Sequence, residues 1–165
     1  MVICHSALND PYYVFRLIYI VGGCTHTQRH LKDLCSYNPV TGEWDFLAPM
    51  KVPRSQMGIA ILGNELYVVG GSSRQAEVLR SVEKYSFDED KWTELAPLTH
   101  GRANPAVGAA DGRVYVFGGD QSHESNFFRA QVTLSSAEMY DPLTDTWEEC
   151  ISLPESRSEA GVIVI

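Results

Sequence analysis

A double glycine that returns three times at a fixed interval constrains the fold of this chain more than any other feature. The pairs are Gly22-Gly23, Gly70-Gly71 and Gly118-Gly119, and each lies 48 residues after the one before it. Each pair follows a short apolar run, namely LIYIV, LYVV and VYVF. A unit that repeats at a fixed period of this length is typical of solenoids and propellers, in which neighbouring repeats share a core.

Two aromatic residues and an arginine follow each glycine pair in the same order. They are Tyr37, Tyr85 and Tyr140, then Trp44, Trp92 and Trp147, and then Arg54, Arg102 and Arg157. We interpret all of these residues as structural. Glycine permits close backbone approach, the aromatic rings suit the interface between repeats, and the arginine fork suits backbone carbonyls at a crowded centre.

The apolar runs inside each repeat predict strands. They are short, rich in valine, isoleucine and tyrosine, and bounded by turn residues. Gly63-Asn64 and Asp111-Gly112 separate neighbouring runs, which predicts tight hairpins. Four short antiparallel strands per repeat describe one blade of a β-propeller. The predicted fold is therefore all-β, with about three four-stranded antiparallel blades and a C-terminal closing strand.

The order of these residues resembles the kelch repeat, in which a double glycine is followed by tyrosine, tryptophan and a Pro-x-Arg variant. The resemblance covers residues 17–165 and is to the C-terminal half of a BTB–kelch protein. It implies a kelch-type β-propeller, a protein-binding role, and a cytoplasmic or cytoskeletal location. The segments VEKYSFDEDKW and SSAEMYDPLTDTWEE are also similar to an actin-binding member of that family. In these relatives a BTB domain, absent from this sequence, makes the contact with cullin.

The repeat divides the chain into five segments. Residues 1–16 are expected to be foreign to the repeat, because Ser6 stands where the spacing predicts arginine and Asn9-Asp10-Pro11 interrupts the expected strand. The blades are then predicted as 17–53, which lacks its innermost strand, 54–101, which is complete, and 102–156, which carries a long loop. Residues 157–165 are predicted to be an innermost strand that closes the propeller, with Ile165 at or near the natural C-terminus.

Such a fragment would expose two blade faces that a closed propeller buries. We expect it to be poorly soluble, or to pair as two halves of a six-bladed ring with two-fold symmetry.

The segments between the second and third strands differ between repeats and are the predicted binding site. They span residues 24–33, 72–80 and 120–134, and variable loops on a rigid scaffold carry specificity. The candidate partner-binding residues are His26, Gln28, Arg29, His30, Arg74, Gln75, Glu77, His123, Asn126, Phe127, Phe128 and Arg129. The group Phe127-Phe128-Arg129 has the composition of an interface hot spot, although the two phenylalanines are equally consistent with anchoring a long loop to the blade. Gln56, Asn104 and Glu159, two residues after each arginine, are neighbouring candidates.

Charge and composition exclude several functions. The net charge is −8, which argues against binding to nucleic acid or to an anionic membrane surface. No apolar run approaches the length of a membrane-spanning helix. The four cysteines form no CxxC pair and indicate reduced thiols of a cytosolic protein. Cys24, His26, His30 and Cys35 lack the usual zinc spacing, so neither a metal nor a cofactor is expected.

No catalytic motif is present: the sequence has no nucleophile elbow, phosphate-binding loop or HExxH segment. We therefore predict a non-catalytic protein-binding module. The resemblance implies the substrate-recruiting or actin-binding part of a BTB–kelch adaptor of a cullin ubiquitin ligase, with a substrate peptide or actin as partner. The alternative is a propeller oxidase or hydrolase whose active site is completed by a missing half.

Overall fold

The computed structural model describes residues 2–6, 16–124 and 129–165, in which every regular element is a β-strand. The first sheet contains β1 (Val2–Ser6), β2 (Arg16–Val21), β3 (Leu34–Tyr37) and β4 (Trp44–Leu47). The second contains β5 (Gly58–Leu62), β6 (Glu65–Val69), β7 (Val82–Ser86) and β8 (Lys91–Leu95). The third contains β9 (Ala106–Ala110), β10 (Arg113–Phe117), β13 (Ala137–Asp141) and β14 (Thr146–Cys150), and β11 (Asp120–Glu124) and β12 (Arg129–Thr133) form a separate hairpin.

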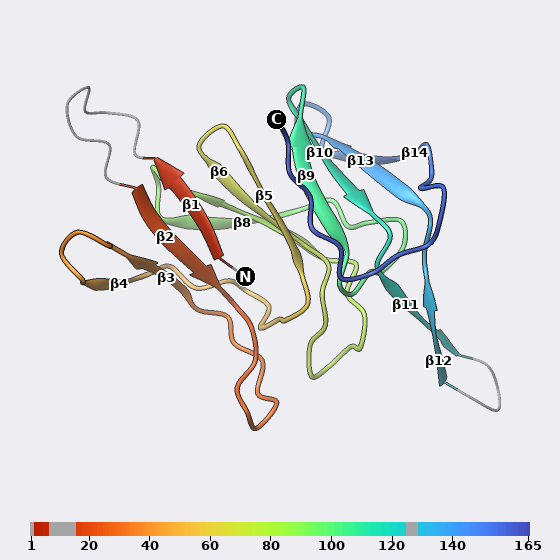
Figure 1. The fold of residues 1–165 in the computed structure, drawn as a ribbon, viewed down its shortest axis with the longest axis horizontal. Helices are drawn as coiled ribbons and strands as arrows, with labels where there is room; N and C mark the ends of the chain where they lie inside the picture. Colours follow the sequence, from red (N-terminus) through yellow and green to blue (C-terminus); the bar gives the residue numbers. More distant parts are fainter. Residues whose placement is uncertain (1, 7–15, 125–128) are drawn as a thin grey trace.

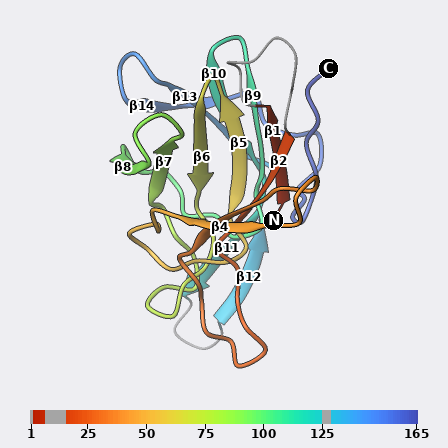
Figure 2. The same cartoon turned by 90° about the vertical axis from the view of Figure 1, so that its left-hand side faces the viewer.

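All strand pairs are antiparallel, and each four-stranded sheet follows the order of the sequence. Figure 1 shows the three sheets side by side, with β1, β5 and β9 at corresponding places in each. Figure 2 shows the same stack from the side of the first sheet. The all-β propeller architecture predicted from the repeat is confirmed.

The hydrophobic core lies between neighbouring sheets. One cluster joins the first two sheets, and includes Val21, Leu34, Met50, Leu66, Tyr85 and Trp92. A second joins the second and third sheets, and includes Val69, Val82, Leu98, Val114 and Tyr140. Because each core is shared, a single repeat has too little buried apolar surface to fold alone.

The double glycines mark the place where neighbouring repeats touch. Gly22 has a φ of 54°, and a Cβ there would lie 2.6 Å from the carbonyl oxygen of Arg54. The second glycine of each pair donates its N–H to the carbonyl of the arginine that begins the next repeat: Gly23 to Arg54 at 2.9 Å, Gly71 to Arg102 at 2.8 Å, and Gly119 to Arg157 at 2.9 Å. A side chain at the first glycine would separate the two repeats.

The structure corrects the prediction for residues 1–16 and for the blade 17–53. Val2–Ser6 pairs with β2 over its whole length, from Val2 opposite Ile20 to Ser6 opposite Arg16, so the first sheet has its innermost strand. The prediction assumed the short hairpin of the other repeats, which placed Ser6 at the arginine position. Strand pairing needs only backbone groups, so a segment without the repeated arginine takes the same edge.

The structure also revises two further segments. Residues 157–165, predicted to be a strand, form no strand, although the Val162 side chain lies against Gly108 of β9. In the part of the chain that the structure describes, no further strand lies beside this segment to pair with it. The segment 120–134, predicted to be a loop, contains the hairpin β11–β12.

Candidate functional site

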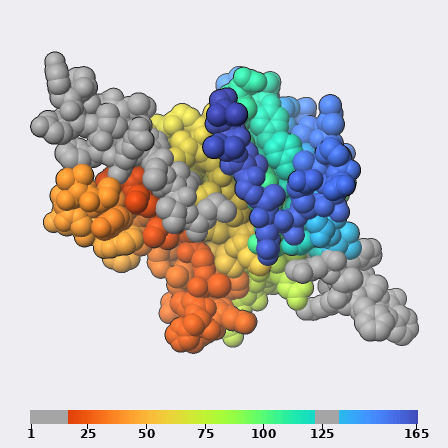
Figure 3. Space-filling view, viewed as in Figure 1, coloured from red at the N-terminus to blue at the C-terminus, as the bar shows by residue number. Residues whose placement is uncertain are grey.

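The connections between the second and third strands of the sheets extend from one side of the molecule. In Figure 1 the β2–β3 loop, the β6–β7 loop and the hairpin β11–β12 all lie at the lower edge. In the space-filling view of Figure 3 the β2–β3 loop stands out as a separate projection at this edge. The two-residue turns β5–β6 and β9–β10 lie at the opposite edge (Figure 1).

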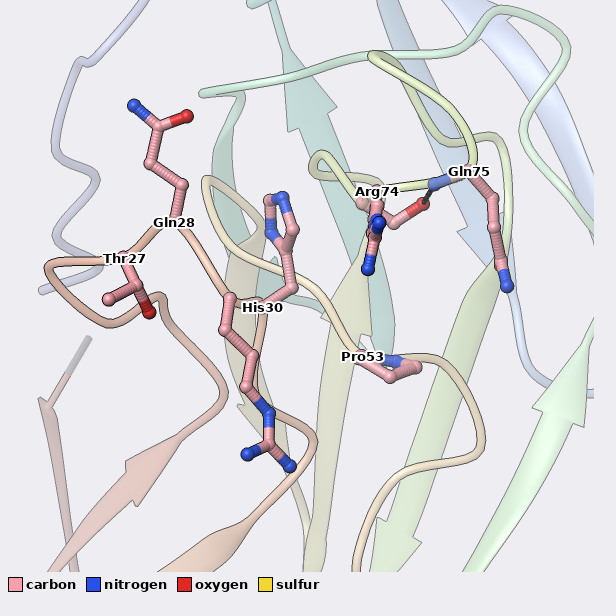
Figure 4. A pocket seen from close by; sticks show the side chains of 8 residues that line it. Thr27, Gln28, His30, Pro53, Arg74 and Gln75 are labelled. Carbon is pink, nitrogen blue, oxygen red and sulfur yellow. Dashed lines mark hydrogen bonds between the residues drawn. The ribbon is translucent and has the colours of Figure 1, made fainter.

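A pocket of about 720 Å³ lies between the first two of these loops. Its walls are the β2–β3 loop and the β6–β7 loop, and Pro53 lies between them (Figure 4). The lining residues are Thr27, Gln28, Arg29, His30, Pro53, Ser73, Arg74 and Gln75. The pocket therefore brings together side chains that lie more than forty residues apart in the sequence.

Local hydrogen bonds shape the first wall. The Thr25 hydroxyl accepts the Arg29 N–H at 3.2 Å, and Gln28 has a φ of 57°, in the left-handed region. His30 Nδ1 lies 3.1 Å from Ser55 Oγ on the next repeat. The loop is thus folded back on itself and tied to the neighbouring repeat through His30.

The second wall is a turn organised by Ser73. This side chain is buried, and its hydroxyl oxygen accepts the N–H groups of Gln75 at 3.2 Å and Ala76 at 3.1 Å. The side chains of Arg74 and Gln75 are exposed. The turn therefore holds two polar side chains at the pocket while Ser73 binds two of its backbone N–H groups.

The pocket differs in charge from the rest of the molecule. Within the part of the chain that the structure describes, its lining contains Arg29, Arg74 and His30 and no carboxylate, whereas the whole chain has a net charge of −8. Both arginines are exposed. A guanidinium group binds carboxylates and phosphates through a planar pair of donors, so the pocket is suited to an anionic group.

Five of the predicted binding residues line this pocket: Gln28, Arg29, His30, Arg74 and Gln75. His26 and Glu77 are exposed on the same two loops and are not lining residues. Asn126, Phe127 and Phe128 lie outside the described residues, so the predicted hot spot has no structural account. His123 and Arg129 are described only as backbone positions of β11 and β12, where His123 is opposite Ala130 and Arg129 is opposite Glu124.

Sequence reasoning missed Thr27, Pro53 and Ser73. Pro53 comes from the connection between the first two sheets, and the fixed spacing to the repeated arginine was a usable signal for its place beside the loops. Thr27 and Ser73 are common loop residues, and nothing in their type distinguishes them from solvated positions.

The residues two positions after each repeated arginine form a connected row. Gln56, Asn104 and Glu159 all have a positive φ, between 51° and 56°. Asn104 donates its N–H to the Gln56 carbonyl at 2.7 Å, and Glu159 donates to the Asn104 carbonyl at 3.0 Å. These backbone bonds link the three repeats but place none of the three side chains in the pocket.

The side chain of the repeated arginine binds the sheet that follows it in the sequence. Arg54 and Arg102 have no exposed surface. Arg54 Nη1 donates to the carbonyls of Gly70 at 2.9 Å and Ser81 at 2.8 Å, and Nη2 lies 2.7 Å from Glu83. Burial lowers the pKa of Arg54, and the Glu83 carboxylate opposes that shift. Arg102 makes the same contacts with Gly118, Ser136 and Glu138.

A second set of hydrogen bonds recurs between the outer strands of neighbouring sheets, and we call this set the clasp. In the second sheet, Asp90 accepts the Ala48 N–H at 2.8 Å and the Tyr85 hydroxyl at 2.7 Å, and the Trp92 indole donates to the Ala48 carbonyl at 2.6 Å. In the third sheet, Asp145, Tyr140 and Trp147 hold Ala96 in the same way.

The residues at the two ends of the repeat lack this environment. Trp44, which packs on Tyr37 with ring centroids 4.8 Å apart, is 52% exposed. The side chain of Arg157 is 53% exposed and lies 4.0 Å from Glu155. Trp44 and Arg157 therefore occupy the repeat positions of Trp92 and Arg102. In the described part of the chain they lack the neighbouring sheet that buries those two residues.

Among the described residues, no group of three or more histidine, cysteine, aspartate or glutamate side chains is arranged to hold a metal ion. Cys24 is exposed, whereas Cys35 is partly buried on β3. Burial, together with the charge of Asp33, raises the pKa of the Cys35 thiol. A helix long and apolar enough to cross a membrane is likewise not found in the described part of the chain.

Comparisons with known proteins address the whole repeat. The KLHDC2/KLHL20/DRC7 Kelch-repeats domain model matches residues 5–164. A solved structure titled "Structure of YjhT" superposes with a TM-score of 0.75 and 14% identity, over 88% of this chain and 55% of that chain. At this identity the likeness is one of fold alone.

Relatives with curated names match shorter stretches. Kelch-like protein 40 of Xenopus tropicalis is 39% identical over 59 residues, which is 31% of this chain and 10% of that protein. Kelch-like protein 40 of Xenopus laevis is 44% identical over 45 residues, which is 27% of this chain and 7% of that protein. Kelch-like ECH-associated protein 1A of Danio rerio is 33% identical over 56 residues, which is 32% of this chain and 9% of that protein. The matched stretches therefore span a tenth or less of these relatives.

Proposed function

Because this chain belongs to the kelch-repeat family, in which propellers serve as protein-binding modules, we propose that it recruits a protein segment rich in carboxylates through the pocket between the β2–β3 and β6–β7 loops. The observation that carries the proposal is the charge of the lining, which among the described residues has two arginines and a histidine and no carboxylate, in a chain of net charge −8. Long-range repulsion by the acidic chain slows the approach of an acidic partner, so the affinity must come from local contacts.

The pocket has the size and exposure expected for a few side chains of an extended segment. Its volume of about 720 Å³ lies within the usual range for ligand sites, roughly 300 to 1,000 Å³. Arg29 and Arg74 approach from separate loops, so two carboxylates of one segment can each receive a guanidinium group. A bidentate arginine–carboxylate contact fixes orientation as well as adding affinity.

More specifically, we propose that this recruitment serves a BTB–kelch adaptor of a cullin ubiquitin ligase in the cytoplasm, with the bound segment as part of the substrate. Similarity to Kelch-like protein 40 and to Kelch-like ECH-associated protein 1A supports this context. The contact with cullin would be made by a BTB domain outside these residues. Binding to actin is the other role that the resemblance implies, and co-sedimentation with filaments distinguishes it from capture of a peptide segment.

The proposed role is non-catalytic, without cofactor. The lining of the pocket supports this, because the only described lining residue of the usual acid–base type is His30, whose Nδ1 lies at hydrogen-bond distance from Ser55 Oγ. Arg29, Arg74 and the neighbouring amides suit binding of an anion rather than attack on a bond.

Binding of a charge-varied peptide library to the immobilised chain tests the proposal. We expect peptides with two or more closely spaced carboxylates to bind, with an affinity that falls as salt rises. Arg29→Gln and Arg74→Gln should each weaken binding by about ten- to a hundredfold, since a charged hydrogen bond contributes roughly 1.5 to 3 kcal/mol.

The matched control is Arg113→Gln, which removes the same charge from β10, at the edge away from the loops. It should leave peptide affinity unchanged. Equal loss in all three variants would mean that net charge, and not the pocket, controls binding. Preference for neutral or basic peptides would overturn the proposal.

A further inference from the structure

The hydrogen bond between His30 and Ser55 joins the first repeat to the second and has no copy at the next boundary. Equivalent places at the two boundaries are identified by backbone bonds. Leu31 and Leu79 donate their N–H groups to the second glycine of their own pair, and their carbonyls accept the N–H of the arginine that begins the next repeat. His30 and Val78 precede these leucines, and Ser55 and Ala103 follow these arginines.

The polar pair His30–Ser55 is therefore replaced by the apolar residues Val78 and Ala103 between the second and third sheets. The positions that hold neighbouring repeats together recur, as the glycine pairs do. Because the second boundary is built without the polar pair, the fold does not require it. His30 is also a lining residue of the pocket, so the role of the pair is to be sought in binding.

The Ser55 side chain is presented to His30 from a fixed position. Ser55 is buried. Its N–H donates to the Ser72 carbonyl at 2.9 Å, and its carbonyl accepts the Ser72 N–H at 2.8 Å. Among the described residues, His30 Nδ1, at 3.1 Å, is the one hydrogen-bond partner of the Ser55 hydroxyl.

The surroundings of this hydroxyl determine which ring nitrogen of neutral His30 carries the hydrogen. If Nδ1 carried it, Nδ1–H would donate to Ser55 Oγ, and the hydroxyl hydrogen of Ser55 would have no acceptor in the described part of the chain. A buried donor without an acceptor is destabilising. Ser55 therefore donates to Nδ1, and the ring hydrogen lies on Nε2.

The Nε2–H group of His30 is available at the pocket. Nε2 makes no hydrogen bond with a described residue and is not among their buried unpaired atoms, so it reaches solvent. Figure 4 shows the His30 ring between Gln28 and Arg74. A neutral N–H donor beside a guanidinium group suits a carboxylate, because a hydrogen bond to a charged acceptor is stronger than one between neutral groups.

We propose that Ser55 positions His30 so that its Nε2–H donates a hydrogen bond to a carboxylate of the bound segment. This inference rests on the proposed function of the pocket. His30 contacts the segment, and Ser55 is a positioning residue that acts through it. The pocket then offers an acidic segment two charged donors, Arg29 and Arg74, and one neutral donor whose direction is set by the neighbouring repeat.

The state of the ring is tested in the free protein. Imidazole nitrogen chemical shifts measured by NMR at about pH 7.5, where histidine is ordinarily mostly neutral, distinguish the two tautomers. The His30 signals are those lost in His30→Val. We expect hydrogen on Nε2 and none on Nδ1, and a shift of the Nδ1 signal in Ser55→Ala as its hydrogen bond is lost. Hydrogen on Nδ1 in the unaltered chain would overturn the proposal, whether or not a peptide binds.

The contact is tested with a short peptide that carries two closely spaced glutamates, at the same pH. We expect His30→Val to raise the Kd by about ten- to a hundredfold, and Ser55→Ala to raise it by a smaller factor. The two changes together should be no worse than His30→Val alone, because Ser55 acts through His30. Ser55→Thr keeps the hydroxyl and should bind within about threefold of the unaltered chain.

The variants are chosen so that the fold survives. His30→Val and Ser55→Ala copy Val78 and Ala103, which already occupy these places at the next boundary, so melting temperatures should change little. Ser86→Ala is the matched control, because it removes a hydroxyl that binds the Glu89 N–H in the β7–β8 turn. It should alter neither the His30 signals nor the Kd.

Failure of this inference is distinguishable from failure of the proposed function. If the peptide binds and Arg29→Gln weakens it, but His30→Val does not, the proposed function stands and the His30 contact is overturned. Additive losses from His30→Val and Ser55→Ala would likewise overturn the positioning role. If no acidic peptide binds the unaltered chain, the proposed function and the contact through Nε2 both fail.

Discussion

The Trp92 indole donates its N–H to the carbonyl of Ala48 at 2.6 Å, across the boundary between the first and second sheets. The bond joins residues 44 apart in the sequence, and Trp147 repeats it with Ala96 on the next boundary. The tryptophan that defines the repeat is therefore a connector between repeats, and its effect on stability depends on whether a sheet precedes it.

Trp92→Phe removes the indole N–H and keeps an aromatic ring at the boundary. We expect it to destabilise the fold by about 1 to 3 kcal/mol, the cost of leaving a partly buried carbonyl without its donor. The measurement is the free energy of unfolding in urea. Trp44→Phe is the matched control, because Trp44 is 52% exposed, and it should change stability by less than about 0.5 kcal/mol. Equal losses would show that the indole bond is not responsible.

The buried pair Arg54–Glu83 predicts a strong dependence on either partner. Both side chains are essentially unexposed, so Glu83→Gln leaves a buried guanidinium without its counterion and should cost about 3 to 5 kcal/mol. Replacing both residues, as Arg54→Met with Glu83→Leu, should cost less than the sum of the single changes. The exposed pair Lys51–Glu94 provides the comparison, since Glu94→Gln should cost less than about 1 kcal/mol. Additive effects at Arg54 and Glu83 would contradict a coupled pair.

Gly70 is predicted to be intolerant of a side chain for two separable reasons. Its φ is 62°, and a Cβ there would collide with the Arg102 carbonyl of the next repeat. Gly63 has nearly the same φ, 60°, with no atom within 4 Å of the Cβ position. Gly63→Ala should therefore lower the free energy of unfolding by about 1 kcal/mol, from the backbone conformation alone. Gly70→Ala should lower it further, because the new side chain also collides with the Arg102 carbonyl. Similar melting temperatures for the two variants would refute the close approach.

Asp90 links stability to pH through the clasp. Hydrogen bonds from the Ala48 N–H and the Tyr85 hydroxyl lower its pKa, so the folded value lies below the unfolded value of about 3.9. Asp90 then adds stability above that pH, and the contribution is lost as the pH falls through the lower folded pKa. Asp90→Asn should flatten the acid side of the stability curve, as followed by urea unfolding between about pH 2 and pH 5. Asp88→Asn removes the same charge from the same turn and serves as the control, and an identical curve for both variants would contradict the linkage.

The repeat spacing predicted the number and type of the sheets because the positions that recur are those that touch a neighbouring repeat. The glycine pairs, Arg54 and Trp92 are such positions. The spacing was misleading for residues 1–16, because β1 has neither the repeated arginine nor the short hairpin of the other sheets. It also failed for 157–165, where strand pairing depends on a partner that the described chain does not provide.

The candidate site was predicted only in part. Gln28, Arg29, His30, Arg74 and Gln75 were recognised because the loops that carry them vary in length. Their convergence was not, since the pocket depends on the separation of two neighbouring sheets, which no single repeat encodes. The sequence favoured Phe127-Phe128-Arg129 in the longest loop, whereas the pocket lies between the two shorter loops.

Site-specific photo-crosslinking within cells tests most directly whether the loop edge is the binding surface. A photoreactive residue would replace Gln75 in the pocket or Asn64 in the β5–β6 turn at the opposite edge of the sheets. The account predicts crosslinks to a partner protein from position 75, lost when Arg29→Gln and Arg74→Gln are added, and none from position 64. Crosslinks from position 64 alone would contradict it.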